Sequence, residues 1–234
     1  MRRLLLSTLL SLTAVLAGCA SSHRPYPSNP VYGEPLKGLV QPGQLRMSRT
    51  AITGAGTKKL ALVRSANVDS ALRYNASVLE WRRWATATYI NTDQQQLLNQ
   101  IAEQVSTDKL FLESLITPLR SSFMEVFVAE DVVEAFEKGA DYVGIFDLQS
   151  SLTDRMSKIM PGPLDWDDVS RVSLVFVDRQ LIAGPDVRVE VTTKTYQKPQ
   201  GPHANTRIAL SKLQENRVTT VSEFDKKIRA VVKR

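Results

Sequence analysis

The sequence predicts a single α/β domain, with helices packed on a mixed sheet, that follows a signal peptide and a flexible linker. Three observations predict this organisation. An apolar run follows two arginines at the start of the chain, a segment rich in proline and glycine comes next, and apolar runs typical of strands then alternate with segments of helical periodicity. We expect residues 1–18 to form the signal peptide, 19–57 the cysteine and linker, and 58–234 the domain.

The composition excludes some classes of protein. Of the 234 residues, 43% are hydrophobic and 23% are charged, as in ordinary globular proteins. The formal net charge of +6 falls to +4 when Arg2 and Arg3 leave with the signal peptide. Because no dense block of lysine and arginine accompanies an aromatic-rich strand, we expect no nucleic-acid binding.

Five cations gather near the last residue of the sequence: Lys226, Lys227, Arg229, Lys233 and Arg234. They are consistent with binding to an anionic lipid or polymer. They are also consistent with a solvated helix face, because cations are stabilising near the C-terminal end of the helix dipole. The second interpretation is preferred on sequence alone.

The first 18 residues are typical of an export signal. Arg2 and Arg3 form its positive end, and residues 4–16 form an apolar core too short to span a bilayer core of about 30 Å comfortably. The core ends at Cys19, which is the only cysteine in the sequence. A single cysteine excludes an internal disulfide and a cysteine-rich metal site.

Residues 16–19 read Leu-Ala-Gly-Cys and resemble the bacterial lipobox, in which small residues precede a cysteine whose thiol receives diacylglycerol. The resemblance implies cleavage before Cys19 and a durable lipid anchor, since each buried CH₂ contributes about 0.8 kcal/mol. The alternative is an ordinary signal peptide with a chance cysteine. Ala20 is not the aspartate that favours inner-membrane retention in the enterobacterial pattern, so the resemblance implies the periplasmic face of the outer membrane.

Residues 20–57 carry five prolines and five glycines and no periodic apolar pattern, which predicts a flexible linker. A random-coil estimate gives this linker a reach of roughly 30–40 Å. Such a tether lets the domain meet peptidoglycan or another envelope protein. The alternative is a spacer with no recognition role.

Strands and helices of the domain are predicted from periodicity. Strands are predicted at 60–63, 123–128, 142–152 and 172–177. Val187, Val189 and Val191 alternate with polar residues, which predicts a strand with one buried face. We expect it to form an antiparallel hairpin with 172–177, with a turn near 184–186.

Helices are predicted from residue 94 and at 112–119, 132–136, 208–213 and 221–232. Asp93 suits an N-cap, Pro118 should kink or end its helix, and Gly139 suits the position after a helix. Ser222 and Asp225 fit a capping box for the last helix. Residues 154–169 are predicted to form a loop, and residues 78–90 are ambiguous between a helix and a strand.

One stretch resembles a known group of proteins. Residues 138–147 read Lys-Gly-Ala-Asp-Tyr-Val-Gly-Ile-Phe-Asp after a helix, and a later strand ends at Asp178. This pattern resembles the periplasmic lipoproteins that include the curli secretion channel protein and the LpoB-type activator of peptidoglycan synthase, with a fold also seen in the N-terminal part of TolB. The resemblance covers 59–232 loosely and 130–195 in detail. It implies the small periplasmic α/β fold more than a pore.

A search for catalytic or metal-binding groups finds no suitable spacing. His23 lies in the linker and His203 in a predicted loop, and neither has a metal-ligand spacing. The acidic run 165–168 lacks the EF-hand pattern, so a turn or helix cap is preferred. Asp141 and Asp147 share one side of a strand about 20 Å apart, too far for acid–base cooperation. We therefore expect no catalytic residue, no metal and no cofactor.

One cluster is a candidate for partner binding: Trp81, Arg82, Arg83, Trp84 and Tyr89. Tryptophan and arginine are enriched at interface hot spots, and the rings also suit stacking on sugars. The alternative is a pair of core tryptophans at helical spacing with arginines whose stems cover apolar surface. That alternative is preferred.

These expectations together define a non-enzymatic accessory or adaptor lipoprotein of envelope assembly or export. Its expected partners are the membrane, through lipid on Cys19, and another envelope protein or a cell-wall polymer, with a homo-oligomer as a further option. Two alternatives stay open. One is an oligomeric secretion-channel component, and the other is a cell-wall hydrolase whose carboxylates are brought together by folding.

Overall fold

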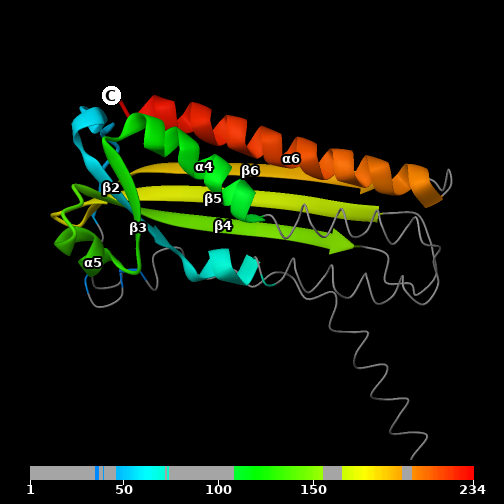
Figure 1. Cartoon of the computed structure of the whole chain (residues 1–234), viewed down its shortest axis with the longest axis horizontal. Helices are drawn as coiled ribbons and strands as arrows, with labels where there is room; N and C mark the ends of the chain where they lie inside the picture. Colours follow the sequence, from blue (N-terminus) through cyan, green and yellow to red (C-terminus); the bar gives the residue numbers. More distant parts are fainter. Residues whose placement is uncertain are drawn as a thin grey trace, which may run out of the picture.

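A six-stranded mixed sheet organises the structure, a computed structural model that describes residues 35–36, 39, 46–71, 73, 108–154, 165–196 and 202–234. The strands lie in the order β1-β6-β5-β4-β2-β3 (Figure 1). In chain order the elements are β1 (Arg46–Met47), the 3-10 helix η2 (Ala55–Thr57), β2 (Lys59–Arg64), α4 (Asp108–Ser122), β3 (Glu125–Ala129), α5 (Val132–Glu137), β4 (Tyr142–Asp154), β5 (Asp165–Asp178), β6 (Ile182–Tyr196) and α6 (Pro202–Val231).

The sheet combines a parallel part and an antiparallel part. Strand β2 pairs parallel with both β3 and β4, while β4, β5 and β6 form an antiparallel meander. The short β1 adds to the outer edge of β6 in parallel orientation. This arrangement confirms the predicted α/β fold with a mixed sheet and packed helices.

The two faces of the sheet bury separate apolar clusters, because successive side chains of a strand point to opposite faces. Leu60 and Leu62 of β2 belong to the larger cluster, whereas Ala61 and Val63 belong to the smaller one. Helices α4 and α6 cover the larger cluster, and α5 lies on the opposite face at one end of the sheet (Figure 1).

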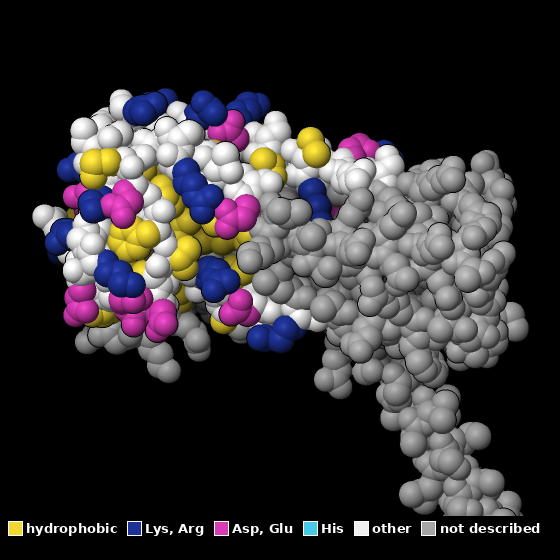
Figure 2. Space-filling model, in the orientation of Figure 1, with side chains coloured by type: hydrophobic (Ala, Val, Ile, Leu, Met, Phe, Trp, Pro, Cys, Tyr) yellow, Lys and Arg dark blue, Asp and Glu magenta, His cyan; other side chains and the backbone are white. Residues whose placement is uncertain are grey.

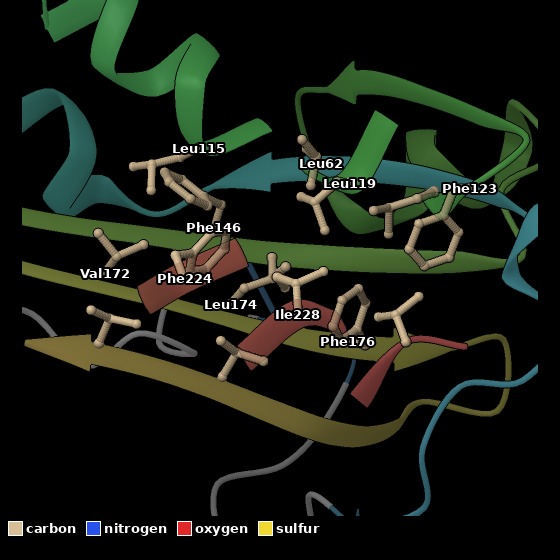
Figure 3. Packing of buried hydrophobic residues seen from close by; sticks show 14 of the residues in the cluster. Leu62, Leu115, Leu119, Phe123, Phe146, Val172, Leu174, Phe176, Phe224 and Ile228 are labelled. Carbon is tan, nitrogen blue, oxygen red and sulfur yellow. The ribbon is translucent and has the colours of Figure 1, made fainter. Parts of the chain in front are cut away.

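Aromatic side chains fill the centre of the larger cluster. Phe224 of α6 meets Phe146 of β4 edge-on, with ring centroids 6.4 Å apart, and Phe123 stacks on Phe176 at 6.0 Å. Figure 3 shows Phe224 and its helical neighbour Ile228 directed toward the strands. Full burial of one such side chain stabilises the fold by about 1.5–3 kcal/mol. The pattern of apolar residues on α6 therefore determines which helix face contacts the sheet.

Several predicted elements are confirmed. Strands β2 and β4 cover the predicted 60–63 and 142–152, and α4 and α5 cover the predicted helices at 112–119 and 132–136. Gly139 follows α5 with a φ of 88°, as expected for the residue that ends a helix in the left-handed region. The ambiguous segment 78–90 and the helix expected from residue 94 lie outside the described residues.

Two local predictions were wrong, and a third was narrowed. Residues 165–169, expected in a loop, form the start of β5, because they pair in register with both β4 and β6. Pro118 was expected to kink or end its helix, and of these two options the helix does not end there but continues to Ser122. The capping box at Ser222 and Asp225 does not form, since both lie inside the single 30-residue helix α6.

The predicted turn near 184–186 was also misplaced. The chain reverses instead after Asp178, whose Oδ1 accepts hydrogen bonds from the amides of Gln180 and Ile182 at 2.9 and 3.0 Å. Leu181 takes a φ of 58° at the end of this turn, and β6 begins at the next residue. The alternation of Val187 and Val189 is nevertheless confirmed, because both are buried on the α6 face.

Candidate functional site

The residues assigned a role from sequence lie outside the described part of the chain. They are Cys19, Trp81, Arg82, Arg83, Trp84 and Tyr89. Lipid attachment at Cys19 and partner binding by the tryptophan–arginine cluster therefore stay predictions. The described residues instead show how the acidic positions are used and where the segment before β2 joins the domain.

Asp141, one of the two carboxylates weighed for acid–base chemistry, fixes the start of β4 to the start of β2. Its Oδ2 accepts a hydrogen bond from the Lys59 amide at 2.9 Å, and its own amide donates to the Lys59 carbonyl at 2.9 Å. The Lys58 ammonium lies 4.0 Å from Oδ1. These contacts give Asp141 a structural role.

Asp147 is buried, with 3% of its surface exposed, and is the centre of a polar cluster on the α5 face of the sheet. Its Oδ1 accepts from the Ser65 hydroxyl and from Asn67 Nδ2 at 2.7 Å, and its Oδ2 accepts from Gln149 Nε2 at 3.3 Å. Buried carboxylates are stable when several donors surround them. Asp147 thus holds the segment after β2 against β4, and sequence reasoning did not anticipate this role.

The acidic run at 165–168 is part of strand β5. Asp168 is buried on the α6 face. There Asn216 of α6 donates to the Asp168 carbonyl at 3.1 Å and to the Val191 carbonyl at 3.2 Å. Within the described ranges, no group of three or more histidine, cysteine, aspartate or glutamate side chains has a geometry that could hold a metal ion.

The chain enters the folded domain through a segment that the sequence pattern assigned to the linker. Ser48 donates to the Ala183 carbonyl at 2.6 Å, which extends β1 along the edge of β6. This approach requires glycine at position 184, because a Cβ there would lie 1.8 Å from the Ser48 carbonyl oxygen. The first strand pairing of this segment with the sheet is thus at the turn end of the β5–β6 hairpin.

The same segment then joins the C-terminal end of α6. Ile52 donates to the Val231 carbonyl at 2.8 Å and accepts from the Lys233 amide at 2.7 Å. Ala55 donates to the Lys233 carbonyl at 3.0 Å. Ile52 and Ala55 are buried in the larger apolar cluster, so residues 46–57 belong to the fold although their composition predicted a linker.

An earlier contact lies at Leu36, which is 4% exposed and buried in the cluster on the α5 face. Leu39 packs beside it, and its amide donates to the Leu36 carbonyl at 3.1 Å. Sequence reasoning missed both positions because two isolated leucines among prolines and glycines show no periodicity.

Strand β3 forms the other edge of the sheet and exposes apolar side chains. Met124, Val128 and Val133 are exposed at this edge and on the following α5. Residues 125–141 around them carry six acidic side chains and one lysine. Hydrogen bonds from Lys138 and from the Glu130 amide lower the pKa of Glu134. The edge therefore combines exposed apolar groups with a strongly negative rim.

The fold and the tether junction define an α/β domain whose entry segment is built into its sheet and its last helix. None of the helices in the described ranges is long and apolar enough to cross a membrane. No family model and no curated protein matches the sequence.

Solved structures with partial similarity include three bacterial proteins. A minor lipoprotein from Acinetobacter baumannii is 11% identical, with 74% of this chain and 91% of that chain covered and a TM-score of 0.36. A PelC dodecamer from Paraburkholderia phytofirmans is 14% identical, with 79% and 95% covered and a TM-score of 0.34. The rare lipoprotein B from Shewanella oneidensis is 11% identical, with 74% and 94% covered and a TM-score of 0.31. None of these similarities assigns the chain to a family.

Proposed function

We propose that this protein is a lipid-anchored accessory or adaptor protein of envelope assembly or export, held on the periplasmic face of the outer membrane. The observation that carries the proposal is the way the chain after Cys19 enters the fold. Hydrogen bonds at Ser48, Ile52 and Ala55 attach that chain to β6 and to the end of α6. A lipid on Cys19 would therefore hold the domain by one defined end.

The distance from the anchor to the domain is short. Sixteen residues lie between Cys19 and the buried Leu36, and a fully extended chain spans at most about 60 Å over the seventeen Cα–Cα steps that join them. The linker predicted from composition, ending at residue 57, would reach at most roughly 135 Å when fully extended. The shorter limit favours a partner close to the membrane surface.

A non-enzymatic role is supported by how the described carboxylates are used. Asp141 binds the Lys59 amide, Asp147 binds Ser65 and Asn67, and Asp178 closes the β5–β6 turn. Each carboxylate is engaged by local hydrogen bonds that maintain the fold. A general acid or base would instead face a cleft that admits substrate.

Lipidation is tested by labelling cells with radioactive palmitate and separating their membranes. The wild-type chain should carry label and sediment with the outer membrane, whereas Cys19→Ala should lose both properties. Ala20→Asp serves as a matched control, because it keeps the cysteine and should move the labelled protein to the inner membrane. An unlabelled wild-type chain would overturn the proposal.

The adaptor role is tested with a photo-crosslinking amino acid at Trp84, compared with the same group at Val218, which is 70% exposed on α6. We expect a discrete adduct with an envelope protein from position 84 and none from position 218. Release of soluble fragments from purified cell walls by the isolated protein would instead support the hydrolase alternative.

A homo-oligomer is a second candidate, favoured by the exposed edge of β3. Edge strands with unpaired backbone groups readily add a strand from another chain, and Val128 adds exposed apolar surface there. Light scattering on the chain from residue 20 onward tests it. A mass of several subunits that falls to one with Val128→Lys supports assembly through this edge, and a wild-type monomer excludes it.

A further inference from the structure

The structure joins two basic segments that lie far apart in the sequence. Residues 46–58 contain Arg46, Arg49 and Lys58 and no acidic residue, and residues 226–234 contain five cations and no acidic residue. Three backbone hydrogen bonds between these segments, two at Ile52 and one at Ala55, hold them side by side. The C-terminal cations, which the sequence alone assigned to a solvated helix face, are therefore one half of a larger surface. We call this surface, formed by residues 46–58 and 226–234, the basic end of the domain.

The basic end keeps an excess of positive charge after its ion pairs are counted. Of its eight cations, Lys58 faces Asp141, Lys226 faces Glu223 and Arg229 pairs with Asp225. Eight cations against these three carboxylates leave a local charge of +5. The ion pairs are also weak in water, because the Lys58, Lys226 and Arg229 side chains are 42%, 78% and 67% exposed.

Seven of the eight cations of the basic end are exposed, and Lys58 is half-buried. Arg46, Arg49, Lys233 and Arg234 are exposed, and Figure 2 shows lysine and arginine side chains gathered along the upper left of the molecule, over the C-terminal part of α6. Met47 stands among them with 56% of its surface exposed. An exposed methionine beside arginines combines an apolar group with charge, as membrane-surface segments do.

The tether enters the fold at this end, through β1 and the hydrogen bonds of Ile52. We propose that the basic end of the domain binds the phosphate groups of anionic phospholipids in the membrane that carries the anchor. The inference rests on the proposed lipid anchor, which would keep these cations near the bilayer. It adds a second, electrostatic contact that fixes which end of the domain faces the lipid.

The contribution of each cation to the free energy of membrane binding can be stated approximately. A lysine or arginine near an anionic bilayer adds about 1 kcal/mol, which is a factor of about five in partitioning. The attraction fades over a Debye length of about 8–10 Å at physiological salt. Because the cations are lysine and arginine, binding should change little between about pH 6 and pH 8 and should fall steeply with added salt.

The test measures binding to vesicles without the lipid anchor. The chain from residue 19 onward, with Cys19→Ala, is sedimented with vesicles of neutral phosphatidylcholine or of phosphatidylcholine with about 30% phosphatidylglycerol, an amount chosen so that the surface potential is large. We expect sedimentation only with the anionic vesicles. Changing four cations of the basic end to glutamine should weaken it at least tenfold: Arg46, Arg49, Lys226 and Lys233.

A matched control removes the same charge elsewhere. Arg64, Arg73, Arg171 and Lys194 are exposed cations outside the basic end. Their joint substitution by glutamine should leave vesicle binding within about twofold, because the factor of about five per cation holds only near the surface. Circular dichroism and the unfolding midpoint check that both variants fold.

Three outcomes would overturn the inference: no binding to anionic vesicles, equal binding to neutral vesicles, or equal loss in both quadruple variants. Retention on an anionic polysaccharide column without vesicle binding would also overturn it and assign the surface to a polymer. The palmitate experiment is independent of these results, since the vesicle assay uses a chain that has no lipid. Failure of the lipid anchor and failure of the basic end are therefore distinguished.

Discussion

The pairing of β1 with β6 depends on glycine at position 184, and the substitution Gly184→Ala tests this directly. The backbone there has a φ of 128°, and an added Cβ would lie 1.8 Å from the Ser48 carbonyl oxygen. Alanine therefore combines backbone strain of about 1–3 kcal/mol with displacement of β1 from β6. Loss of the β1 ladder removes about two or three backbone hydrogen bonds at about 1 kcal/mol each.

Gly139→Ala provides the matched control. Gly139 also has a positive φ, 88°, but an added Cβ would meet no atom within 4 Å. Its substitution should cost only the backbone strain, about 1–2 kcal/mol. Gly184→Ala should cost roughly 3–6 kcal/mol in total, which for a domain of this size lowers Tm by roughly 10 °C or more.

Urea unfolding measures both free energies, and limited proteolysis measures the local effect. In Gly184→Ala the chain near residues 46–50 should be cut before the domain unfolds, whereas Gly139→Ala should resist cutting there. Equal destabilisation by the two variants, with no early cleavage, would refute the role assigned to Gly184.

Three further predictions concern the α6 contacts and one ion pair. Phe224→Ala should lower the free energy of unfolding by about 3–5 kcal/mol in urea, while Val218→Ala on the exposed side of α6 should stay within about 0.5 kcal/mol. Asn216→Ala should cost about 1–3 kcal/mol by calorimetry, since buried carbonyl groups lose their donor. Because the pKa of Glu134 is lowered in the folded state, its ionised carboxylate adds a small contribution to folding stability that is present above pH 4.5 and is lost as the pH falls through the folded-state pKa. Lys138→Gln removes the main cause of the lowering and should move the pKa of Glu134 upward in an NMR titration.

The helices and strands could be predicted where apolar residues recur at one regular spacing, either that of a strand or that of a helix. The alternation through Val187 and Val189 predicted the buried face of β6, and Gly139 correctly marked the end of α5. The start of β5 could not be predicted, because the polar run at 165–168 has loop composition. It is a strand only because β4 and β6 flank it on both sides. Local patterns cannot reveal pairing of this kind.

Non-local contacts also explain the other differences between sequence and structure. Helix α6 was expected as two pieces, because few apolar residues occur between 213 and 221, yet Asn216 anchors that stretch to the sheet through carbonyl groups of β5 and β6. The basic end was half predictable. Its C-terminal cations are evident in the sequence, but their union with Arg46 and Arg49 depends on the pairing of Ile52 with Val232.

The length of α6 has a mechanical consequence. Thirty helical residues extend about 45 Å, close to the length of the 15-residue β6 on which the helix lies. Because α6 packs along β5 and β6 over a similar length, we expect the helix and the hairpin to bend little and to move as one rigid body about the end that holds Ile52. A rotation of this rigid body by about 10° about the Ile52 end would shift the other end of α6, about 45 Å away, by about 8 Å. Small displacements at the end that holds Ile52 would thus become large displacements at the open end of the β5–β6 hairpin, where Asp165 pairs with Tyr196.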